Sequence, residues 1–356
     1  MTEATPPDPQ KLEKFAGKFV SDLSAAVHGS TVVLGDRLGL YKALNVPGGL
    51  TSHELAERTE TKERFVREWL AAQAASEYVC FDAATGRFFL SPEQAFTLTN
   101  EAGPAFFPGA FYVVASTYKD EPKIVEAFQS GKGVAWHEHH PDLFSGTSKF
   151  FRPGYMANLV PSWLPALEGV VPKLERGARV ADVGCGFGSS TLIMAAAFPR
   201  SEFFGFDYHA FSIDAARSGA ALERAVERVH FEVATAQNFP GNGYDLITFF
   251  DCLHDMTDPV GAARHVRATL KPDGVWMVVE PFAGNSLSEN LTPVGRTFYS
   301  ASTMICTPAA LSEKGGAGLG AQASDRQIRE VAEAGGFTRF RRATETPFNR
   351  IFEIRP

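Results

Sequence analysis

The sequence predicts an α/β protein in which a doubly wound, largely parallel sheet follows a small domain of helices and two short strands. From residue 178 onward, short apolar segments typical of buried strands alternate with stretches of helical periodicity. Before residue 98 the helical pattern gives way to two short strands around a turn. At 356 residues the chain is also long for one hydrophobic core. We therefore expect three regions: an N-terminal domain at 1–98, a helical linker and lid at 99–175, and the sheet domain at 176–356.

The N-terminal region has the element order of a winged helix. Apolar residues recur at helical spacing over 12–44, which predicts two helices, and further helices are expected over 53–58 and 61–76. Strands at 78–81 and 87–90 would form the wing. Residues 1–100 carry ten Lys and Arg against thirteen Asp and Glu. This balance favours a dimerisation or substrate-capping role over DNA recognition.

Composition excludes several other classes of protein. Hydrophobic residues make up 44% of the chain and charged residues 21%, as in ordinary globular proteins. The net charge of −7 argues against nucleic acid as the main ligand. The polar first ten residues do not resemble a secretory signal, and no run of 18 apolar residues follows, so we expect a cytoplasmic protein without a membrane partner. Four scattered cysteines without a C-x-x-C pair suggest neither a disulfide framework nor a cysteine-rich zinc site.

The second half of the chain predicts the sheet in order. Strands are expected at 180–183, 202–206, 229–233, 246–250 and 275–280, joined by right-handed crossovers. A polar, Gly-containing stretch at 284–323 interrupts the alternation. A helix and a strand pair, 337–343 and 348–354, then close the chain.

The sharpest motif lies at the end of the first of these strands. Residues 180–190 read VADVGCGFGSS, a buried strand that runs into a glycine-rich turn and then a helix. Glycine permits tight dihedrals and close approach of a ligand, and this is where a doubly wound sheet binds nucleotides. Asp207 follows Gly188 by nineteen residues at the end of the next strand, where its carboxylate can accept both ribose hydroxyls. The spacing G-x-G-x-G differs from the dinucleotide form and favours a ligand without a pyrophosphate.

These residues resemble the first motif of the class I S-adenosylmethionine methyltransferases, and the resemblance continues through Asp207, 236–238 and 244–251. It implies a Rossmann-like methyltransferase sheet, S-adenosylmethionine as cofactor and S-adenosylhomocysteine as product. The segment that meets adenine often carries an acidic residue in this family, whereas this chain has Thr235, so Gln237 or Asn238 would supply the contact. The implied cofactor-binding residues are Asp182, Gly184, Gly186, Asp207, Tyr208, Ala236, Gln237, Asn238, Phe250 and Asp251.

A candidate base follows the fourth strand of the sheet. His254 has an ordinary pKa suited to proton abstraction near neutrality, although with Asp255 it could also simply cap the next helix. The segment resembles the Leu-His-Asp-Trp motif of winged-helix small-molecule O-methyltransferases, with Met256 in place of Trp. In that family an acidic residue after the fifth strand orients the histidine, and here Glu280 matches it, although it could instead cap a loop. The resemblance implies O-methylation of a small, largely apolar acceptor by His254, Glu280 and Asp255.

Residues 136–141 read WHEHHP, and three histidines in four residues raise the question of a metal. Their spacing does not match H-E-x-x-H, so we expect a substrate-pocket, lid or structural role and no metal. Aromatic residues near 150 and 298 could line the same pocket or belong to the core. The predicted pocket residues are Trp136, His137, His140, Phe151, Tyr155, Phe298 and Tyr299.

Taken whole, the chain resembles a bacterial group of winged-helix methyltransferases, some of them labelled transcriptional regulators. The favoured hypothesis is a homodimeric small-molecule methyltransferase. A second is a DNA-binding regulator that senses S-adenosylmethionine. A third is a metal-assisted C-methyltransferase, which is weakened because no histidine follows His265.

Overall fold

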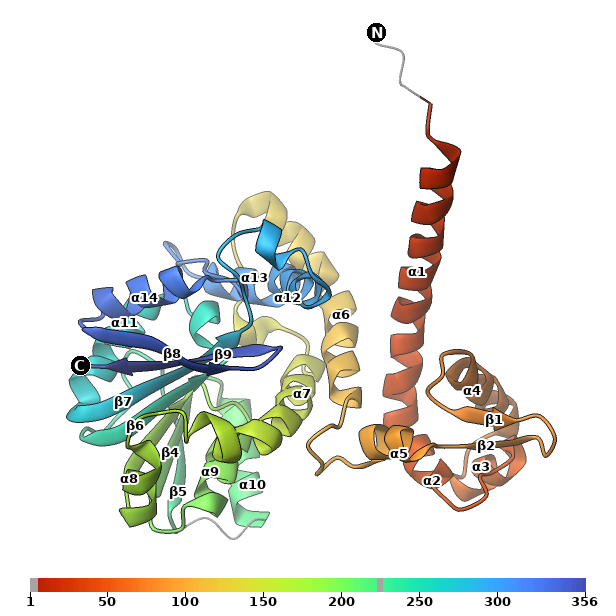
Figure 1. Ribbon diagram of the computed structural model, residues 1–356, viewed down its shortest axis with the longest axis horizontal. Coiled ribbons are helices and arrows are strands. Elements are labelled where there is room, and N and C mark those ends of the chain that lie inside the picture. Colours follow the sequence, from red (N-terminus) through yellow and green to blue (C-terminus); the bar gives the residue numbers. More distant parts are fainter. Residues whose placement is uncertain (1–5, 223–226) are drawn as a thin grey trace. The chain divides into compact units, whose positions relative to one another are not determined.

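The computed structural model describes residues 6–222 and 227–356, and the chain divides into two units, 1–115 and 116–356. The first unit holds the expected helices and wing (Figure 1). Its elements are α1 (Pro9–Arg37), α2 (Leu40–Leu44), α3 (Ser52–Arg58), α4 (Glu63–Ala75), β1 (Cys80–Asp82), β2 (Arg87–Phe89) and α5 (Pro92–Thr99), and α6 (Pro108–Ser130) crosses the boundary.

The break between the first two helices has a local cause. Asp8 caps α1 through the backbone N–H groups of Gln10 and Lys11, and Pro9 is the first helical residue, where it costs no hydrogen bond. Gly39 then adopts a left-handed conformation, φ +67°, which ends one helix and starts the next. The prediction of two helices in 12–44 is thereby confirmed.

The core of the first unit gathers the apolar faces of α2, α3 and α4, with Leu44, Leu55 and Leu70 fully buried. Strands β1 and β2 pair antiparallel as the wing, from Cys80 opposite Phe89 to Asp82 opposite Arg87. The amino-terminal part of α1, in contrast, exposes an apolar stripe of Leu12, Phe15, Phe19, Val20, Leu23 and Val27, each at least half exposed.

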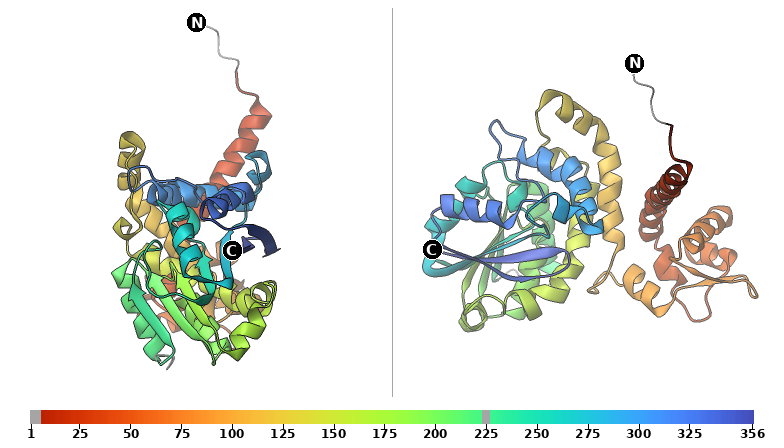
Figure 2. Two further views of the ribbon diagram at one scale, coloured as in Figure 1. Left: turned by 90° about the vertical axis from the view of Figure 1, so that its left-hand side faces the viewer. Right: turned by 45° about the horizontal axis from the view of Figure 1, so that its top comes forward.

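The second unit is built on a seven-stranded sheet in the order β5-β4-β3-β6-β7-β9-β8 (Figure 1). The first five strands in this order are parallel, and β9 and β8 add an antiparallel edge (Figure 2). The strands are β3 (Arg179–Val183), β4 (Glu202–Asp207), β5 (Val229–Val233), β6 (Tyr244–Phe250), β7 (Leu270–Pro281), β8 (Arg339–Glu345) and β9 (Asn349–Arg355). The chain runs outward from β3 to β5 and returns to β6, so the strand order reverses between β3 and β6.

Helices cover both faces of this sheet, because successive strand residues point to opposite sides. Val180 packs on one core with α8, α9 and α10, whereas Ala181 packs on the other with α11 and α14. The helices of this unit are α7 (Asp142–Asn158), α8 (Val170–Arg176), α9 (Ser189–Ala197), α10 (Ala210–Leu222), α11 (Pro259–Thr269), α12 (Pro293–Ala301), α13 (Thr307–Ala310) and α14 (Asp325–Ala334). Shorter turns are the 3-10 helices at 136–138, 253–255 and 288–290 and the π-helices at 159–163 and 302–306.

The doubly wound sheet with an N-terminal winged-helix region is therefore confirmed. The stretch 284–323, for which no helix or strand was predicted, contains α12, a π-helical turn and α13. Thr292 caps α12 by accepting from the Gly295 N–H, and Pro293 follows at the first helical position. None of the helices in the described residues is both long and apolar enough to span a bilayer.

Candidate active site

The glycine turn between β3 and α9 lies where the strand order reverses, the usual ligand position in a doubly wound sheet. The N–H groups of Gly184 and Cys185 both donate to the Phe206 carbonyl at the end of β4, at 2.7 and 3.1 Å. Gly184 and Gly186 have φ of +73° and +52°, in the left-handed region that favours glycine. A Cβ built on Gly186 would meet nothing within 4 Å, so the turn leaves open space beside its backbone.

Asp182 stabilises this turn through hydrogen bonds to α9 and β6. Its carboxylate accepts hydrogen bonds from the hydroxyls of Ser190 and Thr191 at the start of α9, at 2.7 and 2.5 Å, and from Thr248 on β6, at 3.0 Å. Burial raises its pKa to about 6, although these three hydroxyl donors favour the charged form. Asp182 is buried and does not line the cavity described below, so its contacts position the backbone.

Asp207 ends β4 and faces the glycine turn. One carboxylate oxygen accepts from the Gly186 N–H at 3.0 Å and the other from the His209 N–H at 2.9 Å. Burial raises the pKa of Asp207, and these two backbone donors partly offset the effect. Each oxygen retains a further lone pair for a ligand donor.

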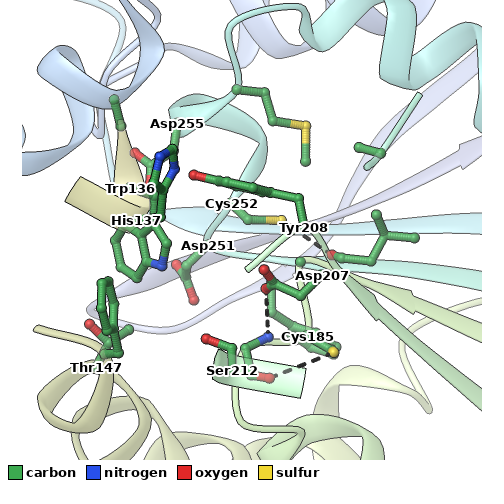
Figure 3. A pocket seen from close by; sticks show the side chains of 18 of the residues that line it. Trp136, His137, Thr147, Cys185, Asp207, Tyr208, Ser212, Asp251, Cys252 and Asp255 are labelled. Atoms are coloured by element: carbon green, nitrogen blue, oxygen red, sulfur yellow. Dashed lines mark hydrogen bonds between the residues drawn. The ribbon is translucent and has the colours of Figure 1, made fainter. Parts of the chain in front are cut away.

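These residues border a cavity of about 510 Å³ in the second unit (Figure 3). Asp207 and Tyr208 extend into it from the end of β4, Asp251 and Asp255 from the region after β6, and Trp136 and His137 lie along one side. Of the residues predicted from sequence, Gly184, Gly186, Asp207, Tyr208, Ala236, Gln237, Phe250, Asp251, Asp255, Trp136, His137, Phe151 and Tyr155 line this cavity.

The other predicted residues lie elsewhere. The cavity lining does not include Asp182, Asn238, His140, Phe298, Tyr299, His254 or Glu280. Asn238 closes a turn by accepting from the Thr235 N–H at 3.0 Å, and the Gln237 side chain donates to the Asp258 carbonyl at 3.1 Å.

Asp251 adopts φ +50°, an uncommon left-handed conformation for a residue other than glycine. Its Oδ1 accepts from the Asn349 amide at 2.9 Å, and its Oδ2 lies 3.5 Å from the Tyr155 hydroxyl. Burial, reinforced by the nearby charge of Glu280, raises the pKa of Asp251 well above its usual range. A half-buried carboxylate with an uncommon backbone conformation, lying in a cavity, is typical of functional sites.

His254 is buried between two carboxylates behind the cavity wall. Its Nδ1 lies 2.6 Å from Glu280 Oε2, and its Nε2 lies 3.2 Å from Asp255 Oδ1. Burial disfavours the charged imidazolium, but Glu280 and Asp255 outweigh that effect and raise the pKa of His254 well above its usual range. The structure thus brings together the three residues predicted as catalytic, with Asp255 as the member that reaches the cavity.

A second buried histidine–carboxylate pair was not predicted from sequence. His139 Nδ1 lies 3.1 Å from Asp120 Oδ2 of α6, and both side chains are almost fully buried. The run of histidines at 137–140 drew attention to this segment, but nothing local in the sequence pairs His139 with a residue nineteen positions earlier.

Comparison with known proteins finds a family match in each of two parts of the chain. Residues 174–334 match the family described as "Methyltransferase domain", and residues 26–100 match the "Rv2258c-like winged HTH domain". Residues 174–334 are thus identified as a methyltransferase domain, similar to S-adenosylmethionine-dependent methyltransferases. The chain is also similar to the uncharacterized methyltransferase YcgJ of Bacillus subtilis, at 34% identity over 107 residues, or 30% of this chain and 41% of YcgJ. The chain spans less than two thirds of the length of the curated relatives it matches first.

Solved structures share the whole fold. An O-methyltransferase family protein from Burkholderia thailandensis is 17% identical with a TM-score of 0.69, and the match covers 99% of each chain. Human N-acetylserotonin methyltransferase in complex with S-adenosylmethionine is also 17% identical with a TM-score of 0.68, over 100% of this chain and 99% of that one. At these identities the likeness establishes the fold of the methyltransferase and its N-terminal domain.

Proposed function

We propose that this chain transfers the methyl group of S-adenosylmethionine to an oxygen of a small, largely apolar acceptor. The observation that carries the proposal is the open glycine turn hydrogen-bonded to Asp207, with both lining one cavity at the reversal point of a methyltransferase sheet. The O-methyltransferases among the structural neighbours support oxygen as the methylated atom. The cofactor would supply an activated methyl group on a sulfonium.

The described residues fit this cofactor. Gly184 and Gly186 would lie against its methionine part, because a side chain on the open face of Gly186 would occupy the cavity. Asp207 would accept the ribose hydroxyls with the lone pairs that its two backbone contacts leave free. Ala236 and Gln237 line the part of the cavity that would hold adenine.

His254 and its two carboxylates would take the proton that the acceptor loses. Glu280 holds Nδ1 and thereby fixes the ring, so Nε2 faces Asp255. Because Asp255 reaches the cavity and His254 does not, we propose that Asp255 relays the proton from the acceptor to the Nε2 of a neutral imidazole, once the two groups, 3.2 Å apart, come into line. A positioned base of this kind typically contributes about 10²- to 10⁴-fold to a rate.

The N-terminal domain would serve dimerisation. The exposed apolar stripe of α1 is a surface that a second copy could cover, and exposed apolar patches of this kind commonly mark interfaces. The match to a winged helix-turn-helix domain keeps a DNA-binding regulator as the second candidate. Two arginines of the candidate recognition helix α4 argue against it, because Arg64 pairs with Glu68 and Arg67 with Glu63.

The decisive experiment incubates the chain with radiolabelled methyl donor and a panel of phenols, fatty acids and keto acids. Methylation of one class and heat on titration with S-adenosylhomocysteine are expected. His254→Ala should lower turnover about 10²-fold or more while it spares cofactor affinity. His230→Ala, which changes an exposed histidine on β5, is the matched control. Unchanged turnover in His254→Ala would remove His254 from the mechanism, and salt-dependent binding to a defined duplex without methylation would favour the regulator.

A further inference from the structure

A metal-ligand set surrounds the side of His254 that faces away from Glu280. One ligand atom each from His254, Asp255 and Cys306 lie within 4.8 Å of one another. His254 and Asp255 come from the 3-10 turn after β6, and Cys306 ends the π-helical turn before α13. Imidazole, carboxylate and thiolate are the side chains that bind zinc and similar ions in proteins.

The orientation of His254 suits a ligand. A histidine that binds a metal through one ring nitrogen commonly donates the other N–H to a carboxylate, which fixes the tautomer and the ring. Glu280 Oε2, 2.6 Å from Nδ1, occupies that position, and Nε2 is the nitrogen left for an ion.

The spacing of the ligand atoms also fits. His254 Nε2 and Asp255 Oδ1 lie 3.2 Å apart but are not aligned as a hydrogen bond, and Oδ1 finds no hydrogen-bond partner among the described residues. Two ligands about 2.0 to 2.1 Å from a tetrahedral zinc ion are roughly 3.3 Å from each other. An ion could therefore bind both atoms with little movement.

We propose that His254, Asp255 and Cys306 form a binding site for a divalent transition-metal ion of the zinc type. An ion on Nε2 takes the lone pair that would accept a proton. Metal binding should therefore inhibit methyl transfer, a consequence that rests on the function proposed above.

The test uses the full chain, stripped of metal with a chelator and titrated with Co²⁺ and with Zn²⁺. We expect one ion per chain by calorimetry and a thiolate-to-cobalt charge-transfer absorption. Cys306→Ser should abolish that absorption, and Cys80→Ser, which changes a thiol of the first unit, should keep it. His254→Ala and Glu280→Gln should each weaken the ion about tenfold or more. Unchanged affinity for S-adenosylhomocysteine shows that a variant is folded.

Each outcome separates the two proposals. No binding of either ion, or binding that Cys306→Ser and His254→Ala leave unchanged, overturns the site. Stoichiometric binding with inhibition by Zn²⁺ supports the site and the role of His254 as proton acceptor. Metal binding that raises turnover would contradict both the inhibitory site and the role of His254 as proton acceptor. Metal binding in a chain that fails to bind S-adenosylhomocysteine retains the site and refutes the proposed function.

Discussion

Replacing Asp207 by Asn tests the cofactor site most directly. The two side chains have nearly the same shape, and Asp207 already holds the Gly186 and His209 N–H groups, so the turn keeps at least one of these contacts. What the variant loses is the charge that would accept two ribose hydroxyls. Hydrogen bonds to a charged group contribute about 1.5 to 3 kcal/mol each, so we expect a loss of about 3 kcal/mol or more. This corresponds to roughly 10²-fold weaker binding.

The assay is calorimetric titration of S-adenosylhomocysteine and of its 2′-deoxy analogue. The unaltered chain should discriminate strongly between the two ligands, and Asp207→Asn should bind both weakly with little discrimination. Asp207→Ala, which also loses both backbone contacts, should show no measurable binding. Asp214→Asn makes the same chemical change at an exposed position of α10 and should behave as the unaltered chain. Affinity within twofold of the original in Asp207→Asn would refute the reasoning.

Two further predictions concern stability and assembly. Burial raises the pKa of Asp182 from 3.8 to about 6, so the folded chain binds this proton more tightly than the unfolded chain, and stability falls as pH rises from 4 to 7. Two pKa units correspond to about 3 kcal/mol. Measured by denaturant unfolding without cofactor, the free energy of unfolding of Asp182→Asn should lack this part of the pH dependence. The same pH dependence in Asp182→Asn and in the unaltered chain would contradict the assignment. For assembly, light scattering should give a mass twice the 38.6 kDa of one chain. The double variant Phe15→Lys/Phe19→Lys should have the mass of a single chain. Phe65→Lys, which changes an exposed aromatic residue outside α1, should keep the doubled mass. A monomeric original chain would reject the dimer.

The sheet and the cofactor turn were predictable because their signals are local. Each parallel strand is a short apolar run that must be buried on both faces, and the turn needs glycine at positions with positive φ. Asp207 could be placed because its distance from the turn along the chain is set by one helix and one strand. The helices at 293–310 also had a local signal, the Thr292 cap followed by Pro293, but no element was predicted in this polar, glycine-containing stretch.

The surroundings of His254 could not be predicted in the same way. Glu280 could be paired with it through the resemblance to winged-helix O-methyltransferases, and the structure agrees because the neighbouring parallel strands β6 and β7 end at the same edge of the sheet. Cys306 is 52 positions away in a segment with no strand to fix its register, and Asp120 meets His139 through the packing of α6. Contacts of this kind depend on how helices pack, which residue spacing alone does not specify.

The carboxylates of the cavity also bear on how a reaction cycle could proceed. Asp207, Asp251 and Asp255 all line it, and burial raises the pKa of each. A positively charged ligand favours their ionised forms, because attraction between opposite charges is strong where water is excluded. Methyl transfer converts a sulfonium into a neutral thioether, so the same carboxylates lose their counter-charge when the product forms. The cavity would therefore bind S-adenosylmethionine more tightly than S-adenosylhomocysteine. The sulfonium charge strengthens binding before the reaction, and its loss in the reaction would favour release of the product.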